Sequence, residues 1–196
     1  MRPRLAFLLL LAAPMPGALA AQWSIAPEIG IVSFSGSARD TAAGMDLGPT
    51  RATTLGFGIA HEDGRLGIAL RFRYGASGLG ASSGDLTVVQ EHAFKLYDVS
   101  SVASLGLTTF GTGTALRLEA GPAVSVWKSK GGERRTRLGA NGGLAVLMPL
   151  GRRSSATLHA EVGVSGSVFD AADVPAGVER RPAWRRSVAL QIRRTW

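Results

Sequence analysis

The sequence has no cysteine among its 196 residues. That absence excludes disulfides, thiolate metal sites and a lipid anchor on an N-terminal cysteine. Lysine is scarce, heptad repeats are missing, and no apolar run after residue 20 reaches the ~20 residues that a membrane-spanning helix needs. No helix is therefore predicted in the remainder of the chain.

The first twenty residues have the pattern of a secretory signal peptide. Two arginines precede the apolar run 5–13, and small residues end the segment at Ala20. We expect cleavage after Ala20, so that residues 21–196 form one exported domain. Export separates the chain from nucleic acid, which is not expected as a partner despite a net charge of +8.

Most of the mature chain alternates apolar residues with small or polar ones. This period of two is typical of β-strands with one apolar face. It predicts an all-β protein with eight strands near 22–34, 52–61, 66–74, 94–110, 115–127, 137–150, 156–169 and 187–196.

Three features indicate that the apolar face meets lipid and the polar face lines a lumen. Several strands exceed the ~9–11 residues needed to cross a bilayer at a tilt. Glycine and alanine are concentrated on the polar face, as a narrow lumen requires. Aromatic residues fall near strand ends, where two membrane-interface girdles would place them: Trp23, Phe34, Tyr74, Phe110, Trp127, Phe169, Trp184 and Trp196.

The connections alternate between short and long. Short turns are predicted at 61–65, 111–114 and 151–155, and long loops at 35–51, 75–93, 128–136 and 170–186. An antiparallel up-and-down transmembrane barrel with periplasmic turns and longer extracellular loops has this order.

The fourth strand is less regular than the others. Across 86–110 the apolar residues change from even to odd positions, which a β-bulge or a second loop reaching residue 93 would explain. Ten strands remain an alternative if 85–94 forms a strand of its own.

The last predicted strand carries a resemblance to known proteins. Val188, Leu190 and Ile192 share its apolar face and Trp196 ends it, which resembles the C-terminal signature by which the barrel assembly machinery recognises outer-membrane proteins; Arg194 departs from that signature. The mature chain as a whole resembles the small OmpA/OmpX/OmpW-like barrels. The resemblance implies a monomer in the bacterial outer membrane, in contact with envelope lipid.

The alternation also predicts which charged residues face the lumen. They are Glu28, Arg71, Arg73, Asp98, Arg117, Glu119, His159, Glu161 and Arg193, with four positive and four negative groups beside His159. An unpaired buried charge costs several kcal/mol, so we expect an ion-pair network that closes the lumen.

Basic residues gather in two of the predicted outer loops. They are Lys128, Lys130, Arg134, Arg135 and Arg137 in the third loop, and Arg180, Arg181, Arg185 and Arg186 in the fourth. They would suit contact with the anionic phosphates of lipopolysaccharide; simple solvation is the alternative.

A catalytic role has one candidate. His159, Glu161 and Ser165 share a face, and some barrels of this size are lipid A deacylases or acyltransferases. Here alanine and glutamate follow His159, and its face is the predicted lumen. We expect no catalytic, cofactor or metal site. The predicted role is structural or interactive at the envelope, with transport of small apolar molecules as the alternative and a lipid A-modifying enzyme as a remote third.

Overall fold

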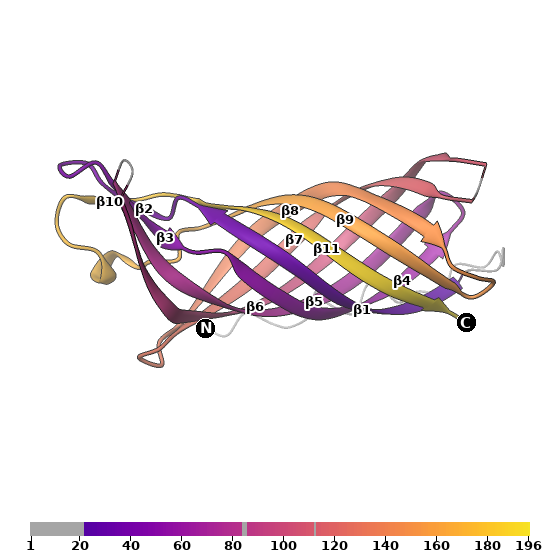
Figure 1. Ribbon diagram of the computed structural model, residues 1–196, viewed down its shortest axis with the longest axis horizontal. Helices are drawn as coiled ribbons and strands as arrows, with labels where there is room; N and C mark the ends of the chain where they lie inside the picture. The colour runs from indigo at the N-terminus through magenta and orange to yellow at the C-terminus, as the bar shows by residue number, and fades with distance from the viewer. Residues whose placement is uncertain (1–21, 84–85, 112) are drawn as a thin grey trace, which may run out of the picture.

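The computed structural model describes residues 22–83, 86–111 and 113–196, so the predicted signal peptide lies outside the described residues. These residues form long, tilted strands around one axis (Figure 1). One 3-10 turn, η1 (Ala171–Asp173), interrupts a connection. In this part of the chain no helix is both long and apolar enough to cross a membrane.

Eight antiparallel strands close into a ring, which confirms the predicted barrel. Each strand pairs with the next one around the barrel, β1 with β11 and β5 with β6 included. The strands are β1 (Gln22–Ser35), β4 (Ala52–Asp63), β5 (Leu66–Ser83), β6 (Leu86–Thr109), β7 (Ala115–Ser129), β8 (Arg134–Pro149), β9 (Ser154–Ser165) and β11 (Ala183–Thr195).

Side chains alternate between the inside and the outside of this ring. In β1, Ser24 and Glu28 are buried whereas Ile25 and Ile29 are exposed. The other ring strands follow the same rule, because successive side chains of a strand point to opposite faces. The small and polar face is therefore the inner one, as the sequence predicts.

Two of the four predicted long loops are wrong. The segment 75–93 belongs largely to a hairpin in which β5 and β6 continue beyond the ring, and only residues 130–133 connect β7 to β8. The other two predicted loops hold the short strands β2 (Ala38–Asp40), β3 (Met45–Pro49) and β10 (Val178–Arg180), which extend the sheet at the loop end of the barrel (Figure 1).

A bulge explains the irregular alternation in β6. Ser77 pairs with Phe94 and Leu79 with Gln90, so three residues of β6 oppose one residue of β5. Within the bulge His92 has a φ of 54°, and the consecutive residues Ala93 and Phe94 are both buried. The bulge is thus the correct explanation, and the ring has eight strands rather than ten.

Glycines face the charged residues of the inner wall. Arg71 lies opposite Gly58, Arg73 opposite Gly56, and Gly143 lies opposite both Glu119 and Glu161. An eight-stranded barrel is only wide enough for its side chains to fill. A glycine on one neighbouring strand therefore leaves space for each of these large side chains in the lumen.

Gly143 and Gly142 provide a matched test of this packing. A Cβ on Gly143 would lie 2.2 Å from the Ala160 carbonyl oxygen, whereas on Gly142 the nearest atom is 3.5 Å away. We expect Gly143→Ala to lower the free energy of unfolding by about 1–3 kcal/mol, as overpacking does. Gly142→Ala should change it by less than about 0.5 kcal/mol. Urea unfolding in lipid vesicles measures both, and equal losses would contradict the packing account.

Candidate functional site

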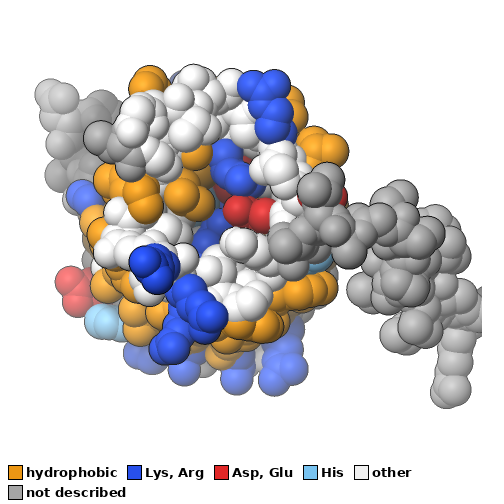
Figure 2. All heavy atoms as spheres, turned by 90° about the vertical axis from the view of Figure 1, so that its right-hand side faces the viewer, with side chains coloured by type: hydrophobic (Ala, Val, Ile, Leu, Met, Phe, Trp, Pro, Cys, Tyr) orange, Lys and Arg blue, Asp and Glu red, His pale blue; other side chains and the backbone are white. Residues whose placement is uncertain are grey.

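Six ionisable side chains from four strands meet in the middle of the lumen. Figure 2 looks into the barrel from the end with the short turns, and shows charged side chains inside the ring and hydrophobic ones around it. The six are at most 6% exposed: Glu28 from β1, Arg71 and Arg73 from β5, Glu119 from β7, and His159 and Glu161 from β9.

Arg71 joins two carboxylates across the lumen. Its Nη1 donates to Glu161 Oε1 at 2.5 Å, and its Nη2 donates to Glu119 Oε1 at 2.7 Å. Neither β7 nor β9 is a neighbour of β5 in the ring. The guanidinium therefore crosslinks walls that no backbone hydrogen bond connects.

Arg73 continues the network toward β1. Its Nε donates to Glu28 Oε1 at 2.5 Å and its Nη1 to Glu161 Oε2 at 2.6 Å. Gln191 of β11 donates to the other Glu28 oxygen at 2.6 Å. An unbroken chain of charge-assisted hydrogen bonds, which are the strong ones, thus reaches from β7 to β11.

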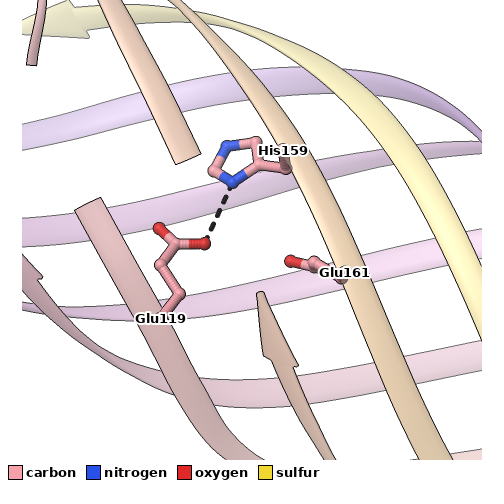
Figure 3. A group of neighbouring side chains, drawn as sticks. All are labelled: Glu119, His159 and Glu161. Atoms are coloured by element: carbon pink, nitrogen blue, oxygen red, sulfur yellow. Dashed lines mark hydrogen bonds and ion pairs between the residues drawn. The ribbon is translucent and has the colours of Figure 1, made fainter. Parts of the chain in front are cut away.

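His159 lies at the far end of this chain. Its Nδ1 is 3.0 Å from Glu119 Oε2, and the ring is fully buried (Figure 3). Ligand atoms of Glu119, His159 and Glu161 lie within 4.8 Å of one another, a spacing that would suit a metal ion. Both carboxylates already accept hydrogen bonds from Arg71, so an added dication would face a guanidinium. The geometry favours an ion-pair network over a metal site.

The same burial weakens an enzymatic interpretation of His159. Ser165 is six residues further along β9, which is about 20 Å at the rise of a strand. The Ser165 hydroxyl donates to the Gly166 carbonyl instead. The candidate base and the candidate nucleophile therefore do not meet.

Three predicted lumen residues lie away from the central network. Toward the turn end, Arg117 Nη2 is 3.1 Å from Glu62 Oε2, and Arg193 pairs with the other Glu62 oxygen. Toward the loop end, Asp98 pairs with Arg185 and accepts a hydrogen bond from Ser125 at 2.7 Å.

The sequence prediction missed three members of these clusters. The alternation predicts strands that end too early, which places Glu62 in a turn and Arg185 in a loop; Gln191 is uncharged and so is not among the predicted charges. The alternation of residue numbers could have identified them. Glu62 continues the even-numbered inner series of Gly58 and Ala60 in β4, and Arg185 and Gln191 belong to the odd-numbered inner series of β11.

With these additions, the lumen clusters just described hold as many arginines as carboxylates. Each of these arginines forms an ion pair with at least one of these carboxylates. The arginines are Arg71, Arg73, Arg117, Arg185 and Arg193, and the carboxylates are Glu28, Glu62, Asp98, Glu119 and Glu161. The six side chains of the central network are at most 6% exposed, so they leave little open space around one another. The network fills the centre of the lumen.

An apolar plug covers the network on the loop side. We use this name for the buried cluster Ala38, Ala93, Phe94, Leu96, Trp127, Val168, Phe169 and Ala183 with Phe34 packed against it. The Trp127 ring lies 5.2 Å from that of Phe34 and 6.1 Å from that of Phe94. The assignment of Phe34, Trp127 and Phe169 to an outer girdle is therefore wrong; Trp23, Phe110, Trp184 and Trp196 do lie exposed outside.

Several of the basic residues assigned to lipopolysaccharide also point inward: Arg185 pairs with the buried Asp98, and Arg135 and Arg137 share the inner face of β8. Arg135 is 8% exposed inside the barrel mouth, where it pairs with Glu133 and, at 3.5 Å, with Asp170. Arg137 donates to Asp170 at 2.5 Å, and this hydrogen bond lowers the pKa of the exposed Asp170 carboxyl. The expected roles of Arg135, Arg137 and Arg185 at the lipid are thus corrected; Lys128, Lys130, Arg134, Arg180 and Arg181 stay at the surface.

Glu161 offers the sharpest test of the network because it accepts from two arginines. Glu161→Gln leaves both guanidiniums underpaired in a buried site, which should lower the free energy of unfolding by about 3–5 kcal/mol. Glu133→Gln removes a carboxylate that is 65% exposed and should cost less than about 1 kcal/mol. Equilibrium unfolding in vesicles compares the two, and a loss for Glu161→Gln as small as the control's would refute the network's role.

Comparisons with known proteins agree with this architecture. No family model and no curated protein sequence matches the chain. Among solved structures, neisserial surface protein A has a TM-score of 0.58 at 11% identity, covering 87% of this chain and 96% of its own. The outer membrane protein OprG from Pseudomonas aeruginosa has a TM-score of 0.56 at 13% identity, covering 89% and 96%. The chain has the fold of small eight-stranded outer-membrane β-barrels.

Proposed function

We propose that this protein is a closed outer-membrane barrel that acts as a structural or interaction element of the bacterial envelope. The observation that carries the proposal is the filled lumen, in which five arginines and five carboxylates neutralise one another beneath an apolar plug. A barrel that passes nothing can still present its outer loops to partners.

The outer wall supports placement in a membrane. Large apolar side chains are exposed on all eight ring strands, among them Leu55 at 58%, Leu70 at 55% and Ile29 at 54%. An apolar surface this continuous is unfavourable in water and suits lipid. Trp23, Phe110 and Trp196 flank it near the turn end, as aromatic residues do at a membrane interface.

Transport of small apolar molecules is the second candidate. The apolar plug favours it, because such transport needs an apolar upper lumen. Yet Val168 and Trp127 are 0% and 2% exposed within the plug, so its members contact one another and leave no open passage among them. Enzymatic activity ranks last, since His159 is fully buried and far from Ser165.

Reconstitution tests the closed barrel. The refolded protein should migrate differently on a gel before and after heating, and planar bilayers containing it should stay almost electrically silent. Steady, large conductance would contradict the closed lumen. A soluble product without heat-dependent migration would contradict the membrane placement itself.

Trp196 should matter for assembly more than for stability. Its side chain is 66% exposed, and its backbone N–H donates to the Trp23 carbonyl at 3.1 Å, where β1 and β11 meet. We expect Trp196→Ala to leave unfolded protein in the periplasm of a producing cell. Trp184→Ala, at the other end of the same strand, is the matched control and should insert normally. Normal insertion of both variants would argue against a C-terminal assembly signal.

A further inference from the structure

Three cations stand side by side on the outer wall near the loop end. Lys95 of β6 lies opposite Lys128 of β7, and Lys128 lies opposite Arg134 of β8. Their neighbours Leu96, Trp127 and Arg135 are buried inside the barrel. Alternation therefore directs Lys95, Lys128 and Arg134 outward, and we call these three residues the cationic row.

The row is electrostatically unfavourable as it stands. Like charges directly opposite each other on neighbouring strands destabilise a sheet. Among the described residues no carboxylate lies within ion-pair distance of any of the three. The adjacent Glu133 pairs with Arg135 instead. Three unpaired cations on adjacent strands concentrate positive charge at one place on the wall, which suits an external anion.

The row borders the apolar belt. One step toward the middle of the barrel, the outward residues are Tyr97, Val126 and Thr136; the next step brings Val99, Val124 and Leu138, which are exposed and apolar. The Tyr97 ring lies 5.2 Å from that of Tyr74, so aromatic side chains mark this level. In a bilayer, charged headgroups lie just beyond such an aromatic level.

We propose that Lys95, Lys128 and Arg134 form a binding site for the phosphate groups of a membrane lipid headgroup, the phosphorylated lipid A part of lipopolysaccharide. The proposal rests on the outer-membrane placement argued above. Cross-strand Cβ atoms lie about 5 Å apart, so the row spans about 10 Å on rigid strands. Arginine matches phosphate with its planar fork, while lysine binds it as a point charge.

The row differs from the site expected from sequence. Lys95 was absent from that expectation because it lies on a strand rather than in a loop. Arg181 pairs with Glu179 at 2.9 Å, so part of its charge is already compensated. Lipid contact is thereby assigned to the barrel wall instead of to the loop tips.

A charge-matched pair of triple variants tests the site. Lys95→Gln, Lys128→Gln and Arg134→Gln together remove the row; Arg65→Gln, Arg152→Gln and Arg153→Gln remove the same charge from exposed positions at the turn end. The probes are bis-phosphorylated lipid A and its dephosphorylated analogue, titrated in a nonionic detergent. We expect the row variant to raise the Kd for phosphorylated lipid A at least tenfold and the control to stay within twofold. The dephosphorylated analogue should bind all proteins weakly and alike.

Thermal unfolding gives a second readout, in which removing a charge of the row stabilises the lipid-free protein although it weakens lipid binding. Without lipid and at low salt, Lys128→Gln should raise Tm because it removes the central repelling charge. Phosphorylated lipid A should then raise Tm more for the parent protein than for this variant.

Equal binding by the parent protein and the row variant would overturn the site, as would an equal loss in the control triple. Such results in a protein that still inserts into vesicles would leave the proposed function intact. Failure of the parent protein to insert into vesicles would instead refute the membrane placement on which the site rests.

Discussion

Charges inside an eight-stranded barrel must be neutralised inside it. The lumen has room for side chains and for little else, and burying an unpaired charge costs several kcal/mol. Arg71 and Arg73 meet this constraint by contacting carboxylates from β1, β7 and β9. Sliding a strand by one residue would turn its inner charges outward into the apolar belt, so the same ion pairs that close the lumen also specify strand register. The glycines opposite Arg71 and Arg73 on β4 leave the space that these long side chains need.

Polarity is layered along the barrel axis. Glu62 with Arg117 and Arg193 lies toward the turns, the central network follows, and Asp98 with Arg185 lies beneath the apolar plug. Outside the wall, an apolar belt is bordered on the loop side by the unpaired cationic row. The inner arginines are thus paired within the molecule, whereas the cationic row has no carboxylate beside it among the described residues, which is why the proposed lipid contact lies on the wall.

The sequence predicts the ring and much of the lumen because both depend on parity. A period of two fixes which residues share a face, and that is enough to bring Glu28, Arg71, Arg73, Glu119, His159 and Glu161 inside. Strand ends depend instead on hairpin pairing, which leaves little local pattern, so Glu62 and Arg185 were lost to misplaced boundaries. Position near a strand end does not reveal the face: Trp127 shares the odd, inner series of Glu119 and fills the plug, although aromatic character alone suggested the membrane interface.

The central claim is that ion pairs across the lumen couple distant strands energetically. A double-mutant cycle on Glu28 and Arg73, with Glu28→Gln, Arg73→Gln and the double variant unfolded in vesicles, measures that coupling directly. The account predicts a coupling free energy of about 1.5–3 kcal/mol, within the range of residues in one buried network. Strictly additive effects, with no coupling beyond about 0.5 kcal/mol, would mean that the lumen charges do not hold the barrel together.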